Sequence, residues 1–356
     1  MSANNDAWSS LQLRYPIIQA PMVGVSTPQL AAAVSNAGGL GSIGLGASSV
    51  AQARELIAAT RALTKQPFNV NLFCHRTPRP DPQREAAWLN YLQPWFEQFG
   101  AEPPSALDVP YPSFNDDPDM LALLLREKPA VVSFHFGLPP KDWITQLKAA
   151  GSVTLGCATN VDEALQIEAA GVDLIVAQGF SAGGHRGTFE PQDGDSELTT
   201  EDLLQQILTH CQRPVIAAGG IMTGQHIQTT LNAGALAVQL GTAFILCPES
   251  SASTTHRQKL GLSQHIQTGI TAAISGRPAR GIINSAYSKI TGPDAPALPD
   301  YPIAYQAGKA LAAAAVAAGS SDFAAHWAGT GAAQARALPA AELISILADE
   351  AGFNRV

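Results

Sequence analysis

Short runs of apolar residues alternate with longer segments of helical periodicity over the first 248 residues of the chain. Apolar runs of this kind are typical of buried strands, and segments whose apolar residues recur every three or four positions are typical of helices packed on a sheet. We expect strands at residues 16–22, 40–43, 67–73, 130–134, 153–157, 174–178, 214–218 and 237–240. We expect helices at residues 28–37, 50–63, 83–99, 143–150, 162–170, 200–210 and 224–233.

The repeated order of strand and helix predicts a parallel sheet, because each helix carries the chain back to the start of the next strand. Eight strands with helices between them match a closed (β/α)₈ barrel of the TIM type, which we predict for residues 1–248. A doubly wound open sheet is built from the same units and stays open as the alternative.

Two segments depart from this repeat. Residues 74–129 are too long for a plain connection, and they contain the expected helix at 83–99 and a Pro-rich stretch, so we predict a functional insertion in the barrel. Residues 249–356 are Ala-rich, with a Gly/Pro stretch at 276–302. We expect them to form a helical extension on the substrate side of the barrel mouth, rather than a second catalytic domain.

Composition and charge argue against several classes of protein. Hydrophobic residues make up 46% and charged residues 14% of the 356 residues, which predicts a large core rather than disorder. The formal net charge of −8 gives no attraction to nucleic acid or to an anionic membrane. Residues 1–10 lack an apolar signal core, and no apolar run reaches the roughly 20 residues of a membrane helix, so we expect a cytoplasmic protein. The four cysteines are widely spaced without a C-x-x-C pair, so we expect neither a metal site nor a disulfide framework.

Glycines follow the last two expected strands. Gly219 and Gly220 come after the seventh strand, and Gly241 and Thr242 come after the eighth. In α/β barrels these two loops often bind a phosphate group, and glycine lets backbone N–H groups approach it closely. The pattern therefore predicts a phosphate-binding site, with ordinary tight turns as the alternative.

A glycine-rich loop with a histidine follows the sixth strand, from Gln178 to Phe189. A histidine over a barrel mouth can transfer a proton or contact an anion, because its pKa lies near neutrality. We therefore take His185 as a catalytic candidate; a loop histidine held by backbone hydrogen bonds is the alternative. The neutral amide of Gln178 is suited to hydrogen-bond a cofactor ring, unless it caps its own loop.

Several segments together resemble the nitronate monooxygenases, formerly called 2-nitropropane dioxygenases. The resemblance extends over about residues 11–345, and it is carried by residues 19–28, 36–41, 181–187, 218–222 and 240–244. Residues 134–137 and 305–309 resemble the class I branch of that family in particular.

This resemblance implies a barrel with one non-covalent FMN and assigns roles to individual residues. The residues implied beside the flavin ring are Ala20, Pro21 and Met22, and those at its polar edge are Asn71 and Gln178. Those implied around the phosphate and ribityl chain are Gly183, Gly219, Gly220, Gly241 and Thr242. His185 is implied as the catalytic residue, and the implied substrate pocket consists of Tyr111, Tyr301, Tyr305 and Lys309, with His135 as a weaker candidate.

The activity implied by the resemblance is oxidation of an alkyl nitronate, such as propionate 3-nitronate, by molecular oxygen. The products are a carbonyl compound with nitrite or nitrate, and the reaction serves detoxification. One alternative is an NAD(P)H-dependent quinone or enoyl-thioester reductase that carries FMN on the same barrel. A second alternative is a non-redox barrel that binds a phosphate metabolite, since fold alone does not determine function. The sequence leaves the oligomeric state and the physiological nitronate open.

Overall fold

The computed structural model describes residues 6–261 and 265–354, so residues 1–5 of the segment examined for a signal core lie outside the described part. Parallel strands form a barrel in the order β1-β9-β8-β6-β5-β4-β3-β2, and a bridge between Ile18 and Leu40 joins its two ends. The strands are β1 Ile17–Gln19, β2 Gly41–Gly44, β3 Phe68–Phe73, β4 Val131–His135, β5 Val153–Ala158, β6 Leu174–Gln178, β8 Val215–Ala218 and β9 Ala237–Leu240. All eight predicted strands are present, and the closed barrel is confirmed over the open sheet.

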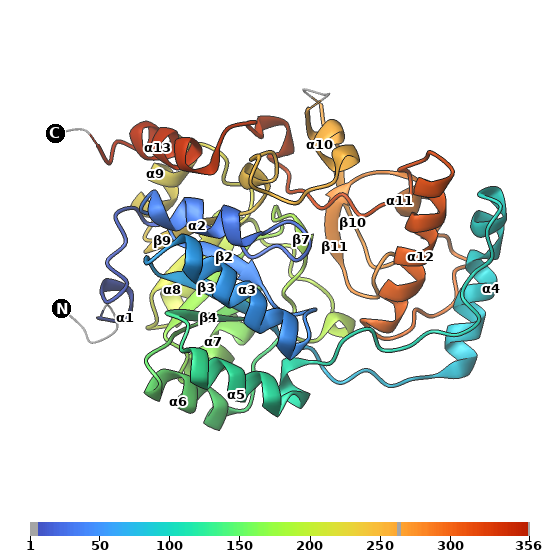
Figure 1. The fold of residues 1–356 in the computed structure, drawn as a ribbon, viewed down its shortest axis with the longest axis horizontal. Coiled ribbons are helices and arrows are strands. Elements are labelled where there is room, and N and C mark those ends of the chain that lie inside the picture. Colours follow the sequence, from blue (N-terminus) through green and yellow to red (C-terminus); the bar gives the residue numbers. More distant parts are fainter. Residues whose placement is uncertain (1–5, 262–264, 355–356) are drawn as a thin grey trace.

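Helices surround the barrel (Figure 1). They are α2 Pro28–Asn36, α3 Val50–Leu63, α5 Pro118–Glu127, α6 Lys141–Ala149, α7 Val161–Ala169, α8 Thr200–His210, α9 Gly224–Asn232 and α13 Ala340–Glu350, with the short α1 Asp6–Ser9 before the first strand. Polar side chains start most of them: Ser49 and Gln52 form a capping box at α3, and Asn160 caps α7.

Three of these helices differ from the sequence prediction, and the first is the short α1, which was not expected. Helix α5 lies within the predicted insertion but beyond the helix expected there at 83–99, although Asp117 caps it and Pro118 opens its first turn. Helix α13 comes from the C-terminal extension but lies beside α2 and α9 (Figure 1), and its apolar residues belong to the barrel core. The predicted boundary at residue 248 therefore separates α13 from the barrel against which it packs.

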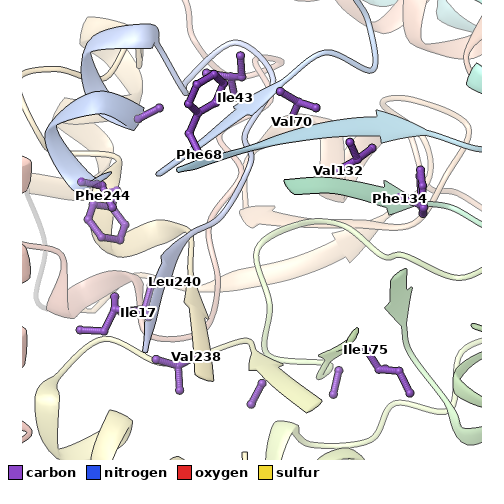
Figure 2. Close-up of a cluster of buried hydrophobic side chains, with 14 of the residues drawn as sticks. Ile17, Ile43, Phe68, Val70, Val132, Phe134, Ile175, Val238, Leu240 and Phe244 are labelled. Atoms are coloured by element: carbon purple, nitrogen blue, oxygen red, sulfur yellow. The ribbon is translucent and has the colours of Figure 1, made fainter. Parts of the chain in front are cut away.

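Strand side chains alternate between the barrel interior and the helix layer, as a period of two requires. On β6, Leu174 and Val176 pack with the interior cluster, whereas Ile175 packs with the outer cluster beneath the helices. Figure 2 shows part of that outer cluster, including Val70 and Val132, which are register partners on β3 and β4. The same alternation directs the next interior residue of each strand toward the mouth of the barrel.

Most of the remaining described chain forms a cap, which we define as residues 74–113, 249–261 and 265–339. Its elements are α4 Pro82–Gln98, α10 Thr254–Gly261, β10 Thr268–Thr271, β11 Ala279–Ile282, α11 Ser285–Lys289 and α12 Ile303–Ala317. The insertion and the extension meet where α4 packs on α12 in a second apolar core, beside the barrel in Figure 1. The expected helical extension is thus present, but it also contains β10 and β11, which the sequence did not predict.

Shorter elements complete the structure. A two-residue strand, β7 Gly184–His185, follows barrel strand β6 and pairs with β11 of the cap, which gives a three-stranded sheet in the order β10-β11-β7. The 3₁₀ turns are η2 Phe114–Asp116, η3 Pro191–Asp193, η4 Thr242–Phe244 and η5 Ala332–Gln334. All four cysteines are buried free thiols. Within residues 6–261 and 265–354, no helix combines the length and apolarity that crossing a bilayer requires.

Candidate active site

A cavity of about 340 Å³ opens where the carboxyl ends of the barrel strands meet the cap. This volume lies in the range of pockets that bind small ligands and cofactors. Every residue that the sequence assigned to the site lines the cavity: Ala20, Pro21, Met22, Asn71, Tyr111, His135, Gln178, Gly183, His185, Gly219, Gly220, Gly241, Thr242, Tyr301, Tyr305 and Lys309. The fold thus brings together residues from six of the barrel strands or the loops that follow them, from the insertion and from the extension.

Interior positions of successive strands form the floor of the cavity. Six polar side chains at the carboxyl ends of β3, β4, β5, β6 and β9 line it, namely Asn71, Ser133, His135, Cys157, Gln178 and Gln239. Sequence reasoning missed Ser133, Cys157 and Gln239. The period-two alternation was the signal that could have found them, because each lies two residues beyond an interior apolar position of its strand.

Two amides of the floor are already engaged by the protein. The Asn71 Nδ2 donates to the Ser133 hydroxyl at 2.9 Å. The Gln178 Nε2 donates to the His185 carbonyl at 3.0 Å, and its Oε1 accepts from the Gly187 backbone N–H at 2.8 Å. Gln178 therefore holds the glycine-rich loop, as the alternative reading of this residue proposed. One N–H of its amide remains for a ligand.

Buried Arg186 fixes the other side of this loop. Its guanidinium pairs with Asp195, with Nε 2.6 Å from Oδ2. Its Nη1 donates to the Gln178 side chain at 3.1 Å and to the Gly179 carbonyl at 2.7 Å. A charge-assisted network of this kind holds the loop in one conformation, so His185 is presented from a rigid support.

At two of the predicted glycines, a side chain would either clash with the protein or extend into the cavity. Gly219 has φ +125°, and a Cβ there would lie 2.8 Å from the Thr200 hydroxyl. At Gly241 a Cβ would make only ordinary contacts, 3.5 Å from the Ala20 Cβ and 3.6 Å from the Met22 Sδ, both of which line the cavity. These bare backbone positions beside β8 and β9 fit a phosphate group at the place where barrels bind one.

The turn after β1 presents Ala20, Pro21 and Met22 to the cavity. The Ser26 hydroxyl accepts from the Met22 backbone N–H at 2.9 Å and from the Gln19 Nε2 at 2.9 Å. Gln19 in turn accepts from the Ser42 backbone N–H at 2.8 Å, which ties the turn to β2. The apolar edge that these residues form suits one face of a planar ring.

His185 lies in an aromatic enclosure beneath the cap. Its ring centroid is 5.2 to 5.8 Å from the rings of four residues, Phe136, Tyr301, Tyr305 and Trp327. Burial, and to a smaller extent the positive charges of neighbouring groups, lower the pKa of His185 to about 3. His185 is therefore neutral near pH 7. Burial likewise lowers the pKa of His135 to about 4, and its Nε2 lies 3.3 Å from the His185 carbonyl.

Tyrosines and one lysine line the cap side of the cavity. The hydroxyls of Tyr111 and Tyr301 are 2.9 Å apart, and burial raises the pKa of both residues, so both stay protonated. Lys309 is exposed at the rim of the cavity. Its Nζ lies 4.4 Å from the ring centroid of Tyr305 and 5.8 Å from that of Tyr111.

A second cation, Arg277, lies behind the aromatic wall. It is buried, and its guanidinium stacks on Phe136 at 4.4 Å while it donates to the Thr188 carbonyl at 2.8 Å. Within the described part of the chain, Arg277 has no carboxylate at ion-pair distance, and no Asp or Glu lines the cavity. The charged side chain that lines the cavity, Lys309, and Arg277 behind its wall are both positive, which favours an anionic ligand. Sequence reasoning missed Arg277, and nothing in the local sequence marks it.

Comparison with known proteins identifies the family. The family model described as nitronate monooxygenase matches residues 4–350. The chain belongs to the nitronate monooxygenase family. It is 55% identical to nitronate monooxygenase from Pseudomonas aeruginosa over 340 residues, which are 96% of this chain and 97% of that protein. It is 56% identical to nitronate monooxygenase from Paraburkholderia phytofirmans over 335 residues, which are 94% of this chain and 92% of that protein.

A solved structure extends the similarity to three dimensions. The nitroalkane oxidase from Streptomyces ansochromogenes superposes with a TM-score of 0.88 at 40% identity, over 97% of this chain and 98% of that one. The resemblance drawn from the sequence is therefore confirmed, and the chain is an oxidoreductase of the nitronate monooxygenase family, whose members are generally flavin-dependent. This membership excludes the non-redox phosphate binder and leaves the reductase as the competing activity for the experiments below.

Proposed function

We propose that this nitronate monooxygenase family member binds FMN in the cavity and oxidises alkyl nitronates with molecular oxygen. The products are a carbonyl compound and nitrite or nitrate, and the reaction detoxifies nitro compounds in the cytoplasm. The observation that carries the substrate class is the charge of the cavity: cations Lys309 and Arg277 lie beside it, and no carboxylate lines it among residues 6–261 and 265–354. A nitronate is an anion, and such surroundings favour it over a neutral compound.

The cavity residues fit FMN. The glycines after β8 and β9, with Gly183 and Thr242, would hold its phosphate and ribityl chain through backbone N–H groups. The turn containing Ala20, Pro21 and Met22 would cover one face of the ring, and Asn71 and Gln178 would hydrogen-bond its polar edge. When bound, FMN supplies the transfer of electrons from the nitronate toward oxygen.

The cap side of the cavity would hold the substrate. Propionate 3-nitronate has a carboxylate besides its nitronate group, and Lys309 at the rim of the cavity would bind that second anion. Tyr111, Tyr301 and Tyr305 have protonated hydroxyls within the same wall and would donate hydrogen bonds to the substrate. His135 would complete the pocket from the barrel floor. Separate groups for the two anions would orient the reacting carbon toward the flavin.

His185 would act on the reacting end of the substrate. A base works best when its pKa lies near the working pH, and burial holds the pKa of His185 at about 3. The free site is therefore poorly matched to removing a proton from a neutral nitroalkane. With a nitronate the proton has already gone, and neutral His185 has only to position the anion. This difference favours nitronates over nitroalkanes as substrates.

Anaerobic mixing separates the proposed activity from the reductase. The purified protein should be yellow, and addition of an alkyl nitronate without oxygen should change its flavin absorbance within the time of turnover. NADH or NADPH should leave that absorbance unchanged on the same timescale. Rapid bleaching by NAD(P)H without a response to nitronate would establish the reductase, and a colourless protein would refute flavin binding.

A further inference from the structure

Ser275 lies directly behind His185, outside the cavity lining. Its side chain is fully buried, at 0% exposure, in the turn that leads into β11. The His185 Nε2 is 2.8 Å from the Ser275 Oγ. Strand β7 carries His185 and pairs with β11 so that His185 is the register partner of Ala279. The ladder thus fixes the distance between the histidine and the serine.

The Ser275 hydroxyl has one proton, and its surroundings decide where that proton goes. The Arg277 backbone N–H donates to Oγ at 3.2 Å. The Arg277 carbonyl lies 3.1 Å from Oγ, and the described residues offer that buried oxygen no other donor. A buried carbonyl without a donor is costly, so the hydroxyl proton belongs to this contact. Oγ must then accept the hydrogen bond from His185.

We propose that Ser275 is a positioning residue that holds the proton of neutral His185 on Nε2 and leaves Nδ1 as the unprotonated atom for the substrate. In a neutral imidazole the hydrogen bond at one nitrogen determines the state of the other. The His185 ring lines the cavity, and no hydrogen-bond partner of Nδ1 is present within residues 6–261 and 265–354. The unprotonated Nδ1 is thus left for a ligand.

The effect of this tautomer on the reaction rests on the proposed function. With a neutral nitroalkane, the α-carbon loses its proton to Nδ1, the electron pair of the C–H bond stays on the substrate as the nitronate, and His185 becomes an imidazolium. The Nε2–H bond to Ser275 persists through this step, so the ring does not turn. With a preformed nitronate no proton moves, and Ser275 contributes only the orientation of the ring.

Nitrogen NMR of the wild-type protein tests the tautomer without any variant of Ser275. Histidine labelled with ¹⁵N in its ring gives signals from eight residues, and the His185 pair is assigned by its loss in His185→Asn. At pH 7 we expect a protonated Nε2 and an unprotonated Nδ1. A proton on Nδ1, or on both nitrogens, would overturn the proposal. This readout does not depend on turnover, so it stands or fails separately from the proposed substrate.

A pair of serine variants tests the consequence. Ser275→Ala should give a mixture of tautomers and lower kcat/KM for a neutral nitroalkane about 2- to 13-fold, the worth of one neutral hydrogen bond. The loss with a preformed nitronate should be smaller. Ser152→Ala is the matched control, because Ser152 is also buried and donates to a carbonyl, that of Pro129 at 2.7 Å, outside the cavity. In His185→Asn, adding Ser275→Ala should cause no further loss; an additive loss would contradict the positioning role.

Discussion

Lys309→Met removes the cation at the cavity rim while keeping a long, flexible side chain. If Lys309 receives the carboxylate of propionate 3-nitronate, its loss should raise KM for that substrate. The nitronate of an unsubstituted alkane has no second anion, so its KM should change little. The variant therefore tests whether Lys309 binds the carboxylate of the substrate.

The structure sets the size of this effect. A hydrogen bond to a charged group contributes about 1.5–3 kcal/mol, which corresponds to roughly 10- to 150-fold in KM. Lys309 is exposed, with its Nζ 4.4 Å from the Tyr305 ring centroid, so water and salt reach its charge. Screening of an exposed pair reduces its contribution. We therefore expect a rise of about 10-fold, at the lower end of that range, and a smaller rise at high ionic strength.

Steady-state oxygen uptake with both nitronates measures the two KM values. Lys289→Met is a matched control, because Lys289 is an exposed lysine of the cap that does not line the cavity. It should leave both KM values unchanged. If Lys309→Met changes KM equally for the carboxylated and the simple nitronate, Lys309 does not bind the carboxylate and the reasoning fails.

Three further predictions concern the cofactor, the histidine and acid stability. Gly241→Leu should weaken flavin retention, because the protein itself tolerates a Cβ there and the rest of the side chain would enter the cavity. Gly261→Leu is the control, because a Cβ at Gly261 would contact nothing. Chromatography of the cofactor released by heat should identify FMN rather than FAD. His185→Asn should reduce turnover of a neutral nitroalkane by about 10²-fold, the lower end of the range for a general base, because the low pKa of His185 makes it a weak base. Turnover of a preformed nitronate should fall less, and equal losses would leave only a positioning role. The melting temperature should fall on acidification from pH 6.5 toward 4, because unfolding lets buried histidines take up protons, each contributing up to about 1.4 kcal/mol per pH unit; a constant melting temperature would contradict this. The histidines whose folded pKa burial lowers to about 3 or 4 are His75, His135, His185, His256 and His326.

The barrel could be predicted because its signals are local. Each strand is an apolar run followed by a helix with its own cap, as at Asn160 before α7, and parallel sheets bury both faces of such runs. Helix α5 has the same kind of signal in Asp117 and Pro118, although the sequence prediction describes only a Pro-rich stretch there. That miss was one of interpretation, since the capping residues were present in the sequence.

The cap could not be predicted in the same way. Strands β7, β10 and β11 have only two to four residues. Strands β10 and β11 pair with each other in an antiparallel hairpin, but β7 pairs with β11 across almost 100 positions, as His185 does with Ala279. No local period reports such a contact. The sequence prediction also missed Ser275 and Arg277, because their contacts are with residues that only the folded chain brings near. The cavity residues were located through family resemblance, and the structure confirms that they meet, whereas their individual roles stay predictions.

Oxygen uptake by the purified protein with propionate 3-nitronate tests the central claim most directly. We predict that uptake begins on addition of the nitronate without any nicotinamide, with nitrite or nitrate formed in proportion, and that NADH alone gives none. Absence of uptake with this and with simple alkyl nitronates, in a preparation that contains FMN and oxidises NADH, would contradict the account.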